Sequence, residues 1–258
     1  MKEILVVDLG MIEYGAAWEL QRRLVAARKA GTVPDVLLLC EHPHVITLGR
    51  NGKAANLRAT DLMLAQLGVS FFETNRGGDI TYHGPGQLVG YPILNLSEIR
   101  RDVGWYVRNI EEAMIRATAE FGISGRRVAG RTGVWVDVQA GSAAEYEKEL
   151  KEVKEAEDEE KLAAIGVHLS RWVTSHGFAY NVSTDLGYFD LIVPCGIAGK
   201  RATSLEKLLG RRVEMREVAP RIAAHLGEIF DLDLRGCDRD DLDVMLRTHE
   251  DRAVLAAI

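Results

Sequence analysis

The feature that most constrains this chain is the glycine-rich stretch at residues 76–87, which reads RGGDITYHGPGQ. Its four glycines would be costly in an ordinary connection, because glycine loses more backbone freedom on folding than any other residue. Backbone without side chains can approach a ligand closely, while Arg76 adds a fixed cation and His83 a group that titrates near neutral pH. We therefore expect a binding loop here, with a plain glycine-rich hairpin as the alternative. Neither GxGxxG nor GxxxxGK[ST] occurs, so a nucleotide loop of those types is not expected.

Composition excludes several classes of protein. The chain has 258 residues, of which 47% are apolar and 27% charged, which is typical of soluble globular domains. Residues 145–160 hold nine acids and three lysines and so account for the whole net charge of −6; the balanced remainder gives no reason to expect nucleic-acid binding. No window approaches the roughly 18 apolar residues of a membrane span, and the N-terminal MKEILVVDLG lacks the features of a signal peptide. Three scattered cysteines favour neither a disulfide framework nor a zinc site, and we expect a cytoplasmic protein.

Hydrophobic periodicity predicts an α+β fold. Helices are expected at 14–29, at 61–67 with Thr60 as cap, through Phe121 with Asp102 as cap, and at 203–209, 218–230 and 237–258. Strands are expected at 1–8, 36–40, within EHPHVITLGRNG at 41–52, and at 69–73, 88–94, 131–138, 161–169, 172–174 and 178–182. Because the strands come in adjacent pairs, we predict one α+β domain over residues 1–236 and a helical extension over 237–258. The segment 141–160 has too few large apolar residues to order itself and is expected to be an acidic surface insertion.

Few residues carry obvious reactive chemistry. Cys195 lies in LIVPCGIAGK, on an expected turn that closes a strand, where a thiol is accessible. It can act as a nucleophile only if a nearby cation or helix N-terminus lowers its pKa; otherwise Cys195, like Cys40 and Cys237, is a small apolar residue. Lys161 is either the last charge of the acidic run or a functional lysine, and His176 is either a structural group or a base. His42 and His44 lack a third ligand at metal spacing, so no metal is expected.

Four blocks taken together resemble the lipoyl(octanoyl) transferase family of lipoate biosynthesis. In chain order they are RGGDITYHGPGQLVGYPIL, KLAAIG, TSHGFAYNV and IVPCGI, and EHPHVITLGR and ATSLEKLLG fit the same pattern. The resemblance covers residues 3–231. It implies a mixed β-sheet flanked by helices, as in the catalytic domains of biotin and lipoate protein ligases.

The resemblance also implies a reaction and its site. Octanoyl would pass from octanoyl-acyl carrier protein to a lysine on the lipoyl domains of 2-oxoacid dehydrogenases or on the glycine-cleavage H protein, without a cofactor. Cys195 would form the acyl thioester, and Lys161 would lower its pKa. The substrate contacts implied are Arg76, Gly77, Gly78, Asp79, Ile80, Thr81, Tyr82, His83, Ala164, Ile165, Gly166, Gly177, Phe178 and Ala179.

Three questions stay open from the sequence. An ATP-dependent lipoate or biotin ligase of the same fold would need an adenylate loop, and no GRGRRGR-like run is present. A carrier-binding module without catalytic activity would have no need of Cys195 and Lys161. The base that takes the proton of the incoming lysine could be Lys161 or a histidine such as His83.

Overall fold

The computed structural model describes residues 2–137, 159–193 and 201–255. Its helices are α1 (Tyr14–Lys29), α2 (Asp61–Gln66), α3 (Val103–Ala119), α4 (Leu205–Leu209), α5 (Met215–Phe230) and α6 (Arg239–Leu255). Its strands are β1 (Lys2–Met11), β2 (Asp35–Glu41), β3 (Val45–Leu48), β4 (Ser70–Glu73), β5 (Ile80–His83), β6 (Gln87–Ile93), β7 (Gly125–Val128), β8 (Arg131–Asp137), β9 (Glu159–Ser170), β10 (Val173–Asn181), β11 (Arg201–Ala202) and β12 (Leu232–Gly236). No helix within these ranges is both long and apolar enough to cross a bilayer.

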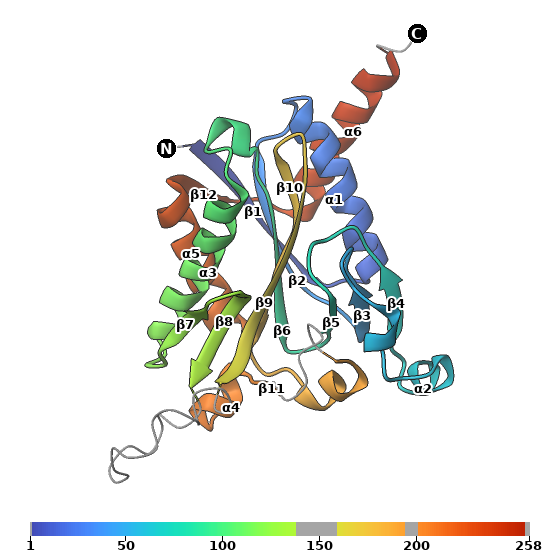
Figure 1. Cartoon of the computed structure of the whole chain (residues 1–258). Coiled ribbons are helices and arrows are strands. Elements are labelled where there is room, and N and C mark those ends of the chain that lie inside the picture. Colours follow the sequence, from blue (N-terminus) through green and yellow to red (C-terminus); the bar gives the residue numbers. More distant parts are fainter. Residues whose placement is uncertain (1, 138–158, 194–200, 256–258) are drawn as a thin grey trace, which may run out of the picture.

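One large mixed sheet organises the molecule (Figure 1). Its strands run in the order β12-β1-β2-β6-β10-β9-β8-β7, and β11 pairs beside the start of β9. The β1 pairs with β2 and β12 are parallel, as is the pair of β11 with β9, whereas the pairs from β2 through to β7 are antiparallel. Helices cover both faces, so the predicted mixed sheet flanked by helices is confirmed.

Strand β2 shows why the sheet needs two layers of helices. Leu37 and Leu39 pack into the core beneath α3 and α5, whereas Val36 and Leu38 pack on the other side with α1 and α6. A strand buried on both faces reads as a continuous apolar run instead of an alternating one. Burial on both faces explains the continuous apolar run VLLLC at 36–40 and agrees with the position of β2 inside the sheet.

Helix boundaries follow their local chemistry. Helix α1 spans Tyr14–Lys29, as its periodicity predicts. The Asp102 side chain accepts the Trp105 N–H at the start of α3, and the Thr60 side chain accepts the Met63 N–H at the start of α2, so both predicted caps are confirmed. These side chains satisfy backbone donors that have no partner within the helix.

A second, three-stranded sheet, β4-β3-β5, lies on the α1 side of the large sheet (Figure 1). Strand β3 is parallel to β4 and antiparallel to β5. Its own small core contains Ile46, Leu64 and Tyr82, and the Phe72 ring lies 5.2 Å from the ring of Tyr14 on α1. This small sheet therefore carries the glycine-rich stretch and holds it against the large one.

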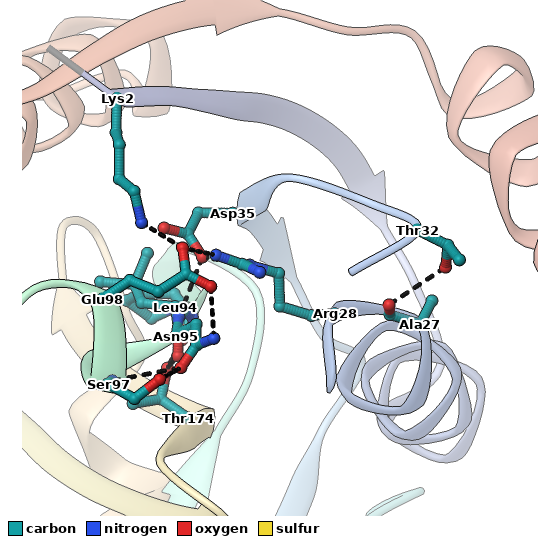
Figure 2. A network of polar contacts seen from close by, with 11 residues as sticks. Lys2, Ala27, Arg28, Thr32, Asp35, Leu94, Asn95, Ser97, Glu98 and Thr174 are labelled. Carbon is teal, nitrogen blue, oxygen red and sulfur yellow. Dashed lines mark hydrogen bonds and ion pairs between the residues drawn. The ribbon is translucent and has the colours of Figure 1, made fainter. Parts of the chain in front are cut away.

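A polar network fixes the end of α1 to the large sheet (Figure 2). The buried Arg28 donates through Nε to Asp35 Oδ1 at 2.6 Å and through Nη2 to Glu98 Oε2 at 2.8 Å. Glu98 also pairs with Lys2, and Asp35 Oδ1 accepts the Asn95 N–H at 2.9 Å. Hydrogen bonds to Arg28 and Lys2 lower the pKa of Glu98 to about 2. The network joins β1, α1, β2 and the turn after β6.

Four strands were not predicted, among them the two-residue strand β11. Strand β5 lies inside the glycine-rich stretch, and β7 and β12 are short strands with little burial. The two strands expected at 172–174 and 178–182 form the single strand β10, because the intervening residues stay paired with β9.

The expected boundary of the acidic insertion at residue 160 is wrong. The insertion lies outside the described residues up to 158, but Glu159 and Glu160 begin β9 and are buried. Glu159 pairs with Arg126 and Arg131, and Glu160 pairs with Lys207 at 2.8 Å. Two carboxylates can be buried here because each has a cationic partner.

Candidate active site

A mostly apolar cavity lies between the large sheet and the glycine-rich stretch. The sheet supplies residues of β6, β8, β9 and β10, and α1 supplies Tyr14. Of the residues expected at the site, those that line it are Lys161, Arg76, Gly78, Asp79, Ile80, Thr81, His83, Ala164, Ile165, Gly166, Gly177, Phe178 and Ala179. Segments more than 80 residues apart in sequence thus meet at one place.

Gly77 and Tyr82 do not line this cavity, and Cys195 lies outside the described residues. Gly77 donates its N–H to the Val167 carbonyl at 2.9 Å and so attaches the stretch to β9. Tyr82 alternates to the opposite face of β5, where it is fully buried in the small core and its hydroxyl lies 2.7 Å from His44 Nδ1. The period of two in a strand separates Tyr82 from its neighbours Thr81 and His83.

Arg76 holds the glycine-rich stretch to β3. Its guanidinium donates to the Thr47 hydroxyl through Nε at 3.1 Å, to the Thr47 carbonyl through Nη2 at 2.6 Å, and to the Gly77 carbonyl through Nη1 at 3.0 Å. The side chain is buried, so water screens its charge little and the charge acts strongly on neighbouring groups. Gly49 permits this packing, because a Cβ there would lie 2.4 Å from the Gly78 carbonyl oxygen.

His83 is buried as a neutral ring with a defined tautomer. The Gln87 amide donates to Asn181 Oδ1 at 2.8 Å, so Gln87 Oε1 is left to accept the His83 Nδ1–H at 2.7 Å. The Thr47 hydroxyl lies 3.5 Å from His83 Nε2. Burial, with the nearby His42 and Arg76, lowers the pKa of His83 to about 3.

Lys161 lies near the start of β9 and points along the cavity wall beside Trp135. Its Nζ lies 5.2 Å from the centre of the Trp135 ring, a cation–π geometry. Gly133 leaves room for the lysine stem, since a Cβ there would lie 2.8 Å from Lys161 Cε. The Lys161 carbonyl accepts the Thr203 N–H at 3.0 Å. Strand pairing and packing therefore fix where the amine lies.

The cavity also contains residues that the sequence did not single out as lining, including Tyr14, Tyr91, Trp135, His176, Asn181 and Phe189. Val89 and Tyr91 could have been found, because strand alternation places them on the same face of β6. His176 and Asn181 lie in a block already associated with the site. Tyr14 and Phe189 carry no such signal, because only tertiary packing brings them to the cavity.

Sequence comparison decides the family. Residues 13–227 match the family described as the lipoyl protein ligase A/B catalytic domain. The chain belongs to this family. An octanoyltransferase from Solibacter usitatus is 52% identical over 234 residues, covering 91% of this chain and 96% of the relative. One from Chloroflexus aggregans is 49% identical, covering 90% and 97%.

Solved structures give the same fold for this member of the lipoyl protein ligase A/B family. A bipartite lipoate protein ligase from Thermoplasma acidophilum superposes with a TM-score of 0.70 at 15% identity, covering 96% of this chain and 92% of that one. A lipoate-protein ligase A bound with ATP gives 0.65 at 16% identity, covering 96% and 93%. At this identity the likeness shows the fold alone.

Proposed function

We propose that this chain is an octanoyltransferase of protein lipoylation, working through a Cys195 thioester with Lys161 beside it. The observation that carries this function is the placement of Lys161 in the wall of the apolar cavity that the glycine-rich stretch closes. An apolar slot with a few convergent polar groups suits an acyl chain that ends in a reactive carbonyl. The octanoyltransferase relatives support the same reaction, because two of them are 52% and 49% identical to this chain over 91% and 90% of its length.

The assignment of the nucleophile rests on the IVPCGI block and on the state of the other thiols. Burial raises the pKa of Cys40 well above its ordinary value. Burial and the acids Asp241 and Asp238 raise the pKa of Cys237. Since the thiolate is the reactive form, neither is suited to attack at neutral pH.

Cys40 also has a histidine neighbour, which makes it the competing candidate. Its Sγ lies 3.6 Å from His42 Nε2, but that nitrogen accepts the Tyr91 hydroxyl at 2.7 Å and the His42 Nδ1–H donates to the Ile12 carbonyl at 2.7 Å. Burial lowers the pKa of His42. Because the His42 imidazole is neutral and already hydrogen-bonded, it cannot activate the Cys40 thiol, and we retain Cys195 as the proposed nucleophile.

The chemistry divides into two steps. Thiolate attack on octanoyl-acyl carrier protein exchanges one thioester for another, and the carrier thiol leaves. The amine of a lysine on a lipoyl domain, such as those of 2-oxoacid dehydrogenases or the glycine-cleavage H protein, then attacks the acyl-enzyme, and amide formation regenerates the Cys195 thiol. The second step needs a base, because a protonated amine is not a nucleophile. We place the reaction in the cytoplasm, as the cysteine usage suggests.

Lys161 suits the role of base better than either histidine. His83 is bonded through Nδ1 and buried, and its pKa is lowered to about 3. His176 donates Nε2–H to Asn75 Oδ1 at 2.8 Å, and burial also lowers its pKa to about 3. Groups with such pKa values are weak bases near neutral pH, since the best catalytic pKa lies close to the working pH.

The decisive experiment is the intact mass of the protein after incubation with octanoyl-acyl carrier protein. We expect one octanoyl adduct that hydroxylamine removes, located by peptide mapping to Cys195, and loss of the adduct when a lipoyl domain is added. ATP with free octanoate tests the ligase alternative and is expected to give no transfer. A label on Cys40 or Cys237 with Cys195 unmodified would refute the assignment of the nucleophile.

A further inference from the structure

A second cleft lies between α1 and the β9–β10 hairpin. It adjoins the apolar cavity of the candidate active site, which is called the acyl cavity below after its proposed function. It is lined by Trp18, Val25, Lys29, Asn75, His168 and Ser175, among others. Ser175 lines this cleft, whereas the next residue along β10, His176, lines the acyl cavity. Only a thin partition at residues 175–176 therefore separates the two spaces.

The backbone of this partition is unusual. His176 has φ +55, a left-handed conformation that is uncommon for a residue with a side chain. Continuing the β6–β10 register from the pair Phe178 and Gly90 places His176 opposite Pro92. Proline has no N–H, so it cannot donate to the His176 carbonyl across the ladder.

Hydrogen bonds from Thr174 and His176 stabilise this irregular backbone of β10. The Thr174 hydroxyl donates to the Pro92 carbonyl at 2.6 Å, and the His176 N–H turns instead to Gln21 Oε1 on α1, at 2.8 Å. A central proline thus breaks one rung of the ladder, and α1 satisfies the donor that this frees. Strained residues held by surrounding structure are concentrated at functional sites.

The His176 ring is held from both sides. Its Nε2–H donates to Asn75 Oδ1, as described above, and its centroid lies 6.1 Å from that of Trp18. Asn75 and Trp18 both belong to the second cleft. The His176 side chain, 2% exposed, therefore fills the boundary between the two spaces.

This boundary lies at the far end of the cavity from Lys161. His176 is opposite Val167 on β9, six residues beyond Lys161, which corresponds to about 20 Å between the two backbone positions. The Lys161 stem covers part of this span, because a Cβ at Gly133 would lie 2.8 Å from Lys161 Cε and 2.3 Å from the Ala163 carbonyl oxygen. From the level of Ala163 to that of Val167 the strand rises about 13 Å. Between these levels the β9 lining is Ala163, Ala164, Ile165 and Gly166. An acyl chain attached near Lys161 and lying along β9 would point its methyl end at the His176 ring.

We propose that His176 is a specificity-determining residue that closes the far end of the acyl cavity and limits the length of the chain transferred. Asn75 and Gln21 act as positioning residues, because they hold the ring and the backbone of this end wall. The inference rests on the proposed octanoyl transfer, and it assigns no proton transfer to His176. Beyond the wall, Trp18 and Val25 form the apolar part of a cleft that is otherwise largely polar, and a longer chain could reach them only if the ring were removed.

The test compares single-turnover transfer from octanoyl- and dodecanoyl-acyl carrier protein by the full-length protein and by His176→Gly. Glycine accepts the left-handed backbone without strain, so this variant should fold. We expect the ratio of the dodecanoyl rate to the octanoyl rate to rise by about tenfold or more, since single methylenes in apolar pockets already change selectivity by such factors. His176→Asn, which also tolerates this backbone, should shift the ratio in the same direction.

His168→Ala is the matched control, because His168 lines only the second cleft; the rate ratio should stay at the wild-type value. Asn75→Ala leaves β10 intact and should raise the ratio less than His176→Gly, which tests the proposal even if the β10 variants fail to fold. Wild-type transfer of octanoyl with an unchanged ratio in these variants would overturn the end-wall assignment alone. Absence of octanoyl transfer in the wild-type protein would instead overturn the proposed function.

Discussion

At the scale of single residues, Lys161 and Trp135 lie side by side in the cavity wall, at the place where the proposed mechanism puts the reaction. The lysine amine lies over the indole ring, and Gly133 leaves the space for its stem. Strand β9 fixes the lysine backbone through its pairs with β8 and β11. A cation placed this firmly can favour a neighbouring thiolate and afterwards give up a proton.

Substitutions at Lys161 should separate these two roles. Lys161→Arg keeps the cation but cannot deprotonate in the working range, so Cys195 should retain part of its alkylation by iodoacetamide at neutral pH while transfer to the lipoyl domain falls about 100-fold or more. Lys161→Ala should impair both steps. The measurements are the pH profile of alkylation and single-turnover transfer from pre-acylated enzyme. A normal profile and normal transfer in Lys161→Ala would exclude the Cys195/Lys161 pair.

At the scale of elements, α6 lies wholly beyond the matched family region, which ends at residue 227. It packs on α1 through the fully buried Leu242 and Leu246, and Glu250 pairs with Arg23 at 2.6 Å. The helix therefore extends the core on the face away from α3 and α5. It contributes no residue to the acyl cavity.

Leu246→Ala should thus affect stability and leave the chemistry unchanged. We expect the free energy of unfolding to fall by about 2–5 kcal/mol, because the change leaves a cavity in a packed core. Transfer per folded molecule should stay at the wild-type rate. Val244→Ala on the same helix, at 52% exposure, is the control and should change stability by less than about 0.5 kcal/mol. Equal stability of the two variants in urea would show that α6 does not share the core.

Elements with strong local signals could be predicted from sequence, and those made by distant contacts could not. Periodicity and capping side chains give α1 and the starts of α2 and α3, because these depend on neighbours within a few residues. Strands β5, β7, β11 and β12 could not be predicted, because they are short and lack an apolar run of their own. The motif blocks place most of the cavity wall, whereas the break at His176 depends on Pro92, which lies 84 residues earlier in the chain.

At the scale of the whole molecule, buried histidines couple the site to stability against acid. His83 and His176 both lie in the cavity wall as neutral rings, and burial is the main cause of their lowered pKa values. Glu98 bonds Arg28 near the C-terminal end of α1, whereas the N-terminal residue of α1, Tyr14, lines the cavity. Arg28 and Lys2 lower the pKa of Glu98 to about 2. These groups make the folded state less able to bind protons than the unfolded chain.

The pH window of this effect follows from the two histidines. Their pKa values fall from 6.5 to about 3 on folding, so between those values the unfolded chain binds more protons and stability decreases as the pH falls. The contribution of the two neutral histidines to the free energy of unfolding is complete above pH 6.5 and is lost as the pH falls towards 3. The Glu98 contribution, which solvent screening reduces because its side chain is 40% exposed, is lost only below its ordinary value of 4.5.

We therefore expect the urea midpoint of the wild-type protein to fall steadily between pH 6.5 and pH 5, before any lowered carboxylate titrates. His83→Gln combined with His176→Asn should flatten the profile in this window, because the unfolded chain then has two fewer protons to bind. Val244→Ala, an exposed substitution on α6 that removes no titratable group, is the control and should leave the slope unchanged. Equal slopes for the wild-type protein and the double variant would mean that the two rings are not held neutral by the fold, and the buried, bonded geometry described for them could not persist in solution.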